Sequence, residues 1–192
     1  TPIGESETNA FTGVFDGNGH KITGLKQTKF NYGGGLFGYT DGATISNVGV
    51  EDVSIDYGNS TADGHGALVG VAKNTTITNS YSTGVIDAQN NVGGLVGYLN
   101  NSTITNSYSA VEVIGDYSAI GGLVGIMSSG STIASSYATG NVTGNNMVGG
   151  LVGSASGTIR YSYSTGDVTG KFYSYLNQYD NNSDQVGGFV GY

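Results

Sequence analysis

One short pattern of small and apolar residues returns six times along the chain and sets its period. Written GGLVG in its commonest form, it begins at residues 34, 66, 93, 121, 149 and 187. The central apolar residues of successive copies are 32, 27, 28, 28 and 38 positions apart. A recurrence every 20 to 50 residues, roughly, is typical of solenoids. In a solenoid each repeat is one coil that buries its apolar face against neighbouring coils.

Two further β-branched stretches follow each copy, bounded by the Gly and Asn residues that admit tight turns. After the third copy these are TIT at 103–105 and VEV at 111–113. Three short strands in about 28 residues predict an all-β fold, a parallel β-helix, which is right-handed because β-crossover-β connections almost always are. We expect one solenoid over 1–192, with a divergent first coil or cap at 1–33 and regular coils at 34–192, as a segment of a larger protein.

Equivalent positions of successive coils lie about 4.8 Å apart in a parallel β-helix, so they form columns along the rod. An inward apolar column, with Thr outward beside it, is predicted at Ile45, Ile77, Ile104, Ile133 and Ile159. A second inward column, whose Ser hydroxyls would bond to one another, is predicted at Val48, Ser80, Ser107, Ser136 and Ser162. A bend between the two columns is predicted at Asn47, Asn79 and Asn106. An outward column follows at Tyr81, Tyr108, Tyr137 and Tyr163.

The glycine-rich pattern itself does not fit simple alternation. In the third copy Leu95 would point to one face of a strand and Val92 and Val96 to the other, although all three are apolar. Two arrangements resolve the conflict. Either a glycine bends the strand so that both rows are buried, which we favour, or one apolar row is exposed and covered by a loop or a partner.

The composition narrows the classes of partner. The chain has 14 acidic residues against 6 Lys and Arg, a net charge of −8, and a single arginine, Arg160. There is no basic stripe for phosphates, so we expect no nucleic-acid partner. No apolar run is long enough to span a bilayer, so we expect no membrane insertion by this segment. The abundance of Ser, Thr and Asn with little Lys favours an extracellular or cell-surface location.

Two groups of aromatic residues are candidates for ligand binding. The longest intervals place loops at 56–66 and 171–185 on one edge of the solenoid. The second loop carries aromatic side chains that could stack on a sugar ring or on another protein, namely Phe172, Tyr173, Tyr175 and Tyr179. The outward tyrosine column would form an apolar platform for glycans or a neighbouring chain. The alternatives are that the loop folds over the core and that the column only stabilises its sheet.

One segment has the spacing of a calcium loop. Asp180, Asn182 and Asp184 are placed like the first three oxygen ligands, but the glycine is misplaced and no Glu closes the site. A solvated turn is therefore the favoured interpretation, as it is for the triplet within residues 16–20. We predict no cofactor, with calcium as the alternative at residues 180–184.

Catalysis is not expected. Polysaccharide-cleaving β-helix enzymes need acids clustered with Arg, Lys or His, and the acids of successive coils are not expected to fall in line. The repeated TIT segments at 76–78 and 103–105 offer another function, because they would form a flat double Thr array with a geometry resembling that of ice-binding solenoids. Ala134 and Arg160 interrupt the second row of this array.

The pattern GGLVG with its TITNSYSTG-like segment resembles the GLUG motif, and FTGVFDGNGHKITGL resembles the stretch that commonly precedes such repeats. GLUG repeats occur in large bacterial surface and secreted proteins, including adhesin-like chains and immunoglobulin A-cleaving metallopeptidases. The zinc motif HExxH of such peptidases is absent from this sequence. The resemblance thus implies a non-catalytic extracellular stalk or adhesive segment, or an accessory recognition module of a secreted peptidase. A glycan or a host or neighbouring-cell protein is the implied partner.

Overall fold

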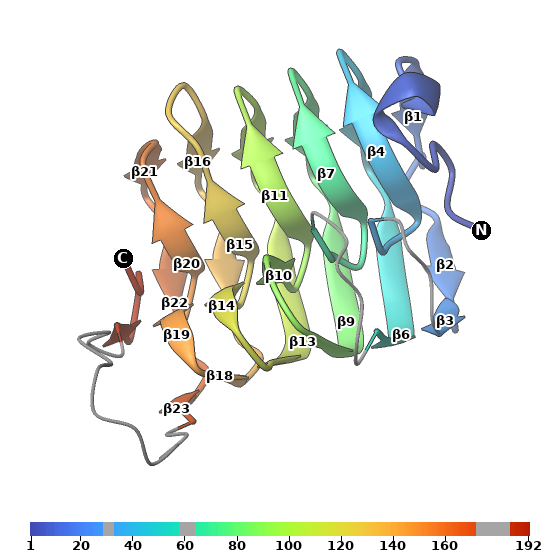
Figure 1. The fold of residues 1–192 in the computed structure, drawn as a ribbon. Coiled ribbons are helices and arrows are strands. Elements are labelled where there is room, and N and C mark those ends of the chain that lie inside the picture. Colours follow the sequence, from blue (N-terminus) through green and yellow to red (C-terminus); the bar gives the residue numbers. More distant parts are fainter. Residues whose placement is uncertain (29–32, 58–63, 172–184) are drawn as a thin grey trace.

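A computed structural model describes residues 1–28, 33–57, 64–171 and 185–192 as a rod of stacked coils (Figure 1). Strands of successive coils pair in parallel, each with its equivalent one coil later. One 3-10 turn, η1 (Glu7–Asn9), lies near the N-terminus. The predicted all-β solenoid is therefore confirmed, with coils of about 28 residues.

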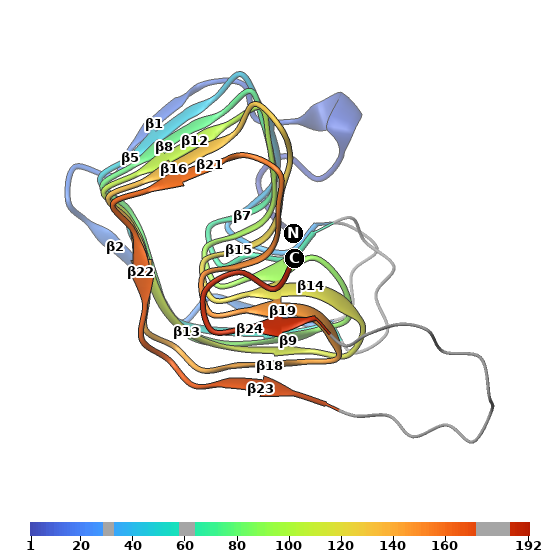
Figure 2. The ribbon, with the colours of Figure 1, turned by 90° about the vertical axis from the view of Figure 1, so that its left-hand side faces the viewer.

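The strands of the stacked coils form four sheets (Figure 2). The sequence had predicted three strands per coil, and so three sheets. The isoleucine sheet contains β1 (Val14–Asp16), β5 (Thr44–Ser46), β8 (Thr76–Thr78), β12 (Thr103–Thr105), β16 (Thr132–Ala134) and β21 (Thr158–Arg160). The tyrosine sheet contains β2 (Lys21–Thr23), β3 (Lys26–Thr28), β6 (Gly49–Asp56), β9 (Tyr81–Ala88), β13 (Tyr108–Gly115), β17 (Tyr137–Ala138), β18 (Val142–Gly144), β22 (Tyr163–Ser164) and β23 (Val168–Gly170).

The other two sheets both arise from the glycine-rich pattern. The inner sheet contains β10 (Val92–Gly93), β14 (Ser118–Gly121), β19 (Asn146–Gly149) and β24 (Val186–Gly187). The return sheet contains β4 (Phe37–Asp41), β7 (Val69–Lys73), β11 (Val96–Asn100), β15 (Val124–Met127) and β20 (Val152–Ala155). Figure 2 shows the inner sheet lying between the tyrosine sheet and the return sheet.

A bend at the glycines separates these two sheets. In the third copy β10 ends at Gly93 and β11 begins at Val96. The side chains of Val92, Leu95 and Val96 are all fully buried, so the favoured bend is confirmed and no apolar row of this copy is exposed. A Cβ atom on Gly93 would overlap the carbonyl oxygen of Val96. Glycine is therefore required here because the two strands meet backbone against backbone.

The predicted isoleucine column is confirmed. In register along the isoleucine sheet it consists of Phe15, Ile45, Ile77, Ile104, Ile133 and Ile159. The four members from Ile45 to Ile133 are fully buried, while Ile159 in the last coil is half-buried. This column forms the centre of a core that continues from coil to coil.

The second inward column is also confirmed, but its hydroxyls bond to the backbone rather than to one another. Ser107 Oγ donates to the carbonyl of Thr105 at 2.8 Å and accepts from the backbone N–H of Ser80 at 3.1 Å. Ser136 repeats this arrangement with Ala134 and Ser107. The reason is that the strand ladder is interrupted at the adjacent bend, so the hydroxyl replaces the missing backbone partner.

The bend before this column has left-handed backbone. Asn47, Asn79 and Asn106 have φ angles of 54°, 48° and 48°, in a region that Asn tolerates better than most residues. Ser135 and Tyr161 take the same conformation in the later coils, with φ of 49° and 52°. The predicted bend is therefore confirmed, and it sets the direction of the tyrosines two residues later.

Candidate ligand-binding surface

The structure brings the four outward tyrosines into register across β9, β13, β17 and β22. Their successive ring centroids are 4.9, 4.9 and 5.0 Å apart, and the ring planes differ by 6°, 1° and 3°. The rings are thus stacked face to face along the rod. Such contacts stabilise neighbouring strands whether or not a ligand binds.

Face-to-face stacking decides which parts of the rings a ligand can reach. Within the column each ring covers the face of the next, so ring edges and hydroxyl groups are what the middle of the column presents. At the end toward β6 the outer face of Tyr81 packs against the backbone of Gly49, whereas Tyr163 at the other end is 51% exposed. A sugar ring that stacks on an aromatic face of this column would therefore use the Tyr163 end.

A charged pair fixes the first ring of the column. Tyr81 Oη donates to Glu51 Oε1 at 2.6 Å, and Lys21 Nζ donates to Glu51 Oε2 at 2.8 Å. The hydrogen bond to this carboxylate raises the pKa of Tyr81 to about 12. The Lys21 bond, followed by the Tyr81 bond, lowers the pKa of Glu51, and the same ion pair raises the pKa of Lys21.

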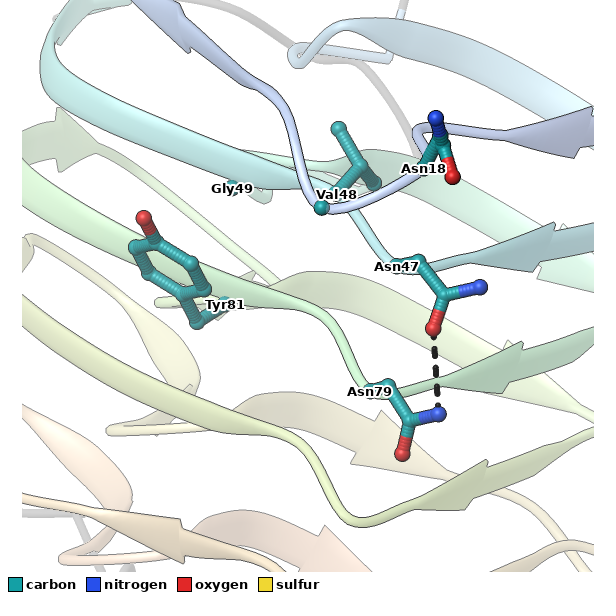
Figure 3. Close-up of a pocket in the computed structure, with 7 residues that line it drawn as sticks. Asn18, Asn47, Val48, Gly49, Asn79 and Tyr81 are labelled. Atoms are coloured by element: carbon teal, nitrogen blue, oxygen red, sulfur yellow. Dashed lines mark hydrogen bonds between the residues drawn. The ribbon is translucent and has the colours of Figure 1, made fainter.

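A hollow of about 340 Å³ lies beside this first ring (Figure 3). It is lined by Asn18, Gly19, Asn47, Val48, Gly49, Asn79 and Tyr81. The hollow exists because Gly49 takes the column position that Tyr81 takes in the next coil. A side chain on Gly49 would overlap the ring of Tyr81.

Amide groups form a row next to the hollow. Asn79 Nδ2 donates to Asn47 Oδ1 at 3.1 Å, and Asn47 Nδ2 donates to Asp16 Oδ1 at 2.9 Å. The backbone N–H of Asn18 donates to the same carboxylate oxygen at 2.8 Å, so the segment is the turn that the sequence predicted. The bond from Asn47, followed by the bond from Asn18, lowers the pKa of Asp16.

Acids do align at one edge of the tyrosine sheet, so the expectation that they would not is wrong there. Asp56 pairs with Asp87 in the next coil, and Lys171 Nζ lies 3.1 Å from Asp116 Oδ1 nearby. Burial, followed by the charges of Asp116 and Asp56, raises the pKa of Asp87. The cause is a β-bulge in β6, which adds one residue to that coil and moves Asp56 opposite Asp87.

The Thr double array is present in the coils that carry TIT. Thr76 pairs with Thr103 and Thr78 with Thr105 between β8 and β12. The outer row continues in register through every strand from β5 to β21, whereas Ala134 interrupts the second row in β16.

Several predicted site residues lie outside the described residues, namely Phe172, Tyr173, Tyr175, Tyr179, Asp180, Asn182 and Asp184. Within the described ranges no group of three His, Asp or Glu residues is arranged to hold a metal ion. In the same ranges, no helix has the length and apolar character needed to cross a membrane.

The GLUG motif family matches residues 88–114, 116–143 and 144–169. These three segments are GLUG repeats. The first of them contains β10, β11, β12 and nearly all of β13, so one GLUG repeat corresponds to one coil through all four sheets. The sequence resemblance is thereby confirmed for the central coils.

A solved structure shares the fold of these GLUG coils. It is the crystal structure of a putative immunoglobulin A1 protease from Bacteroides ovatus, which is 26% identical and superposes with a TM-score of 0.74. The match covers 88% of this chain and 55% of that chain, so the present chain spans about half the length of the Bacteroides ovatus protein. No curated protein sequence matches the chain.

Sequence reasoning missed the hollow, which lies in the coils that precede the matched repeats. Its signal was the replacement of the column tyrosine by Gly49, which is visible on aligning the first coil with the second. The pairing of Tyr81 with Glu51 was also missed, because the residues come from different coils and face each other only once the register is fixed.

Proposed function

We propose that this chain is a non-catalytic, extracellular β-solenoid module that acts as a rigid stalk and adhesive segment of a surface protein. The observation that carries the proposal is the unbroken register of its columns, in which isoleucine pairs with isoleucine and tyrosine with tyrosine from coil to coil. A rod with such continuous pairing keeps its ends at a fixed separation. It also presents identical side chains at a regular interval.

The tyrosine column is the proposed adhesive surface. Tyrosine edges and hydroxyls combine apolar area with hydrogen-bonding capacity, and tyrosine is enriched at protein interfaces for that reason. The proposed partner is a glycan or a protein of a host or neighbouring cell. The candidate residues Phe172, Tyr173, Tyr175 and Tyr179, chosen from the sequence, are part of the same proposal.

A second candidate function is that of an accessory substrate-recognition module in a secreted peptidase. It is favoured by the similarity to the Bacteroides ovatus protein, whose name gives immunoglobulin A1 as the substrate. In this arrangement the solenoid would hold immunoglobulin A1 while a separate domain cleaves it. Both candidates place the chain outside the cell.

A third candidate, a glycan- or ice-binding array, is favoured by the register of Thr76 with Thr103 and of Thr78 with Thr105. Thermal hysteresis of the intact chain that disappears in Thr103→Tyr would support ice binding. The absence of thermal hysteresis in a solution of the intact chain would rule out ice binding.

The main test is binding of the chain to a glycan array and to immobilised immunoglobulin A1. We expect binding to at least one of these, weakened in Tyr108→Ser and Tyr137→Ser. The matched control is Tyr117→Ser, because Tyr117 is 55% exposed and does not belong to the column. No binding to either surface would overturn the adhesive role, and cleavage of immunoglobulin A1 by the chain alone would overturn the non-catalytic one.

Calcium is tested separately. We propose no cofactor, so the melting temperature of the chain should not change between excess chelator and millimolar calcium. A rise with calcium that disappears in Asp180→Asn would instead establish residues 180–184 as a metal site.

A further inference from the structure

We propose that the hollow beside Tyr81 binds one neutral sugar residue. This inference deepens the proposed adhesive function by assigning a site and a ligand class to it. The first observation is that Tyr81 is the ring at which the stacked column ends, since Tyr108 covers one of its faces at a centroid distance of 4.9 Å. The opposite face packs against the backbone of Gly49, where a Cβ would overlap Tyr81 Cζ, so the ring contributes an apolar wall to the hollow rather than a free face.

The second observation is the row of amides at the same place. An asparagine side chain has two N–H donors and one oxygen acceptor. Asn79 and Asn47 each use one N–H within the row, toward Asn47 Oδ1 and Asp16 Oδ1. Each therefore keeps a second N–H for a ligand oxygen. Figure 3 shows the two amides following one another along the rod, with Tyr81 on the neighbouring part of the lining.

The backbone holds these donors in place. Asn18, Asn47 and Asn79 have φ of 50°, 54° and 48°, and each sits at the bend of its own coil. Adjacent coils are joined by the parallel ladders on both sides of this bend. The donors are thus preorganised, which reduces the entropy lost when a ligand binds.

Charge selects among sugars. None of the side chains that line the hollow is ionised at neutral pH, which suits hydroxyl groups. The charged side chains near the hollow are the carboxylates of Asp16 and Glu51 and one cation, Lys21. Lys21 is paired with Glu51 at 2.8 Å. The balance is negative, so an anionic sugar is disfavoured relative to a neutral one. A volume of about 340 Å³ accommodates one sugar ring rather than a folded oligosaccharide.

The test uses the intact chain and the methyl glycosides of neutral hexoses, with the methyl glycoside of sialic acid as the anionic counterpart. Binding is followed by ligand-observed saturation-transfer NMR and quantified by titration. Asn79→Gly removes an amide of the row while glycine tolerates the left-handed backbone. Its matched control is Asn106→Gly, at the same bend one coil later, with φ of 48° and outside the hollow.

Tyr81→Leu removes the ring that borders the hollow, and its control is Tyr117→Leu, which removes an exposed ring that belongs neither to the column nor to the hollow. We expect Asn79→Gly and Tyr81→Leu each to weaken binding of a neutral glycoside by about tenfold, with little change in either control. Circular dichroism checks that each variant is folded. Should Tyr81→Leu not fold, the comparison of Asn79→Gly with Asn106→Gly decides alone.

Three results would overturn the site: no saturation transfer from any neutral glycoside, equal affinities in Asn79→Gly and Asn106→Gly, or tighter binding of the sialic acid glycoside. The failure of the site is distinguishable from the failure of the proposed function. Without the site, binding to immunoglobulin A1 or to larger glycans through the middle of the tyrosine column would still be observed. Without the adhesive function, neither surface would bind the chain.

Discussion

Tyr81 Oη donates a hydrogen bond of 2.6 Å to Glu51 Oε1, and this bond ties the tyrosine column to the coil before it. The other carboxylate oxygen of Glu51 accepts from Lys21, one coil earlier still, at 2.8 Å. Three successive coils are thus connected by side chains on the outer surface of the tyrosine sheet. The column ends at this connection because Gly49 replaces the next ring.

Replacing Glu51 by Gln should lower the pKa of Tyr81 from about 12 toward its ordinary value of 10, because the charged acceptor is lost. The folded-state pKa of Tyr81 lies above the unfolded value. The bond therefore stabilises the fold fully below pH 10, and this contribution is lost as the pH rises from 10 to about 12. The measurement is tyrosinate absorbance against pH, with Tyr81 isolated by subtracting the curve of Tyr81→Phe.

Asp52→Asn is the control for this titration, since Asp52 is an exposed acid next to Glu51 that makes no bond to the Tyr81 hydroxyl. Its titration curve should match that of the unmodified chain. Identical curves for Glu51→Gln and the unmodified chain would contradict the assigned cause of the pKa shift.

Ser107→Ala should destabilise the fold by about 1 to 3 kcal/mol, because the buried backbone N–H of Ser80 loses its hydrogen-bond acceptor. The carbonyl of Thr105 keeps a partner in the N–H of Asn79, at 3.2 Å. Urea unfolding measures the effect. Thr103→Ala, an outward position in the same coil, should change the free energy of unfolding by less than about 0.5 kcal/mol. Equal stabilities for the two variants would contradict the structural role of the serine column.

The columns were predictable because a fixed period aligns equivalent residues whatever the local geometry. At Leu95 the alternation of inward and outward residues along a strand no longer predicts which side chains are buried. Its strand is split by Gly94, and only the contact between two backbones explains why three apolar residues in five positions are all buried. Alternation assumes one continuous strand, so it could not predict that the glycine-rich pattern forms two strands and hence a fourth sheet.

The alignment of Asp56 with Asp87 was missed for a different reason. Counting along β6 and β9 from Val50 and Ser82 places Ile55 opposite Asp87, and only the bulge restores the observed pairing. A bulge depends on one residue's backbone, here Asp52 with φ of 52°, and leaves no periodic signal in a single sequence.

Gly122→Ala should destabilise the fold by about 3 kcal/mol or more, because the new Cβ would overlap the carbonyl oxygen of Gly150 in the next coil. Gly188 occupies the equivalent position in the last copy of the pattern, and a Cβ there would meet nothing within 4 Å. Gly188→Ala should therefore change the free energy of unfolding by less than about 0.5 kcal/mol. Urea unfolding of both variants measures the difference, and similar losses would show that the backbone conformation rather than the contact with the next coil makes glycine necessary.

His65 should make the fold sensitive to acid. Its side chain is fully buried, stacks on Tyr57 at a centroid distance of 4.7 Å, and has no hydrogen-bond partner for either ring nitrogen among the described residues. Burial lowers the pKa of His65 from 6.5 to about 4. Since the folded-state pKa lies below the unfolded value, stability is complete above pH 6.5 and falls as the pH drops toward 4, by about 3 kcal/mol in all.

His65→Leu should remove this part of the pH dependence, because leucine cannot be protonated and fits an apolar site of similar size. The measurement is the free energy of unfolding of the intact chain at intervals between pH 6.5 and 4. Exposed His20 provides the matched control, and His20→Leu should leave the acid slope unchanged. Carboxylates such as Glu51 contribute a slope of the same sign, since their lowered pKa also costs stability in acid. The difference between the two histidine variants cancels that shared contribution, so equal slopes would mean that His65 leaves its buried position before it is protonated.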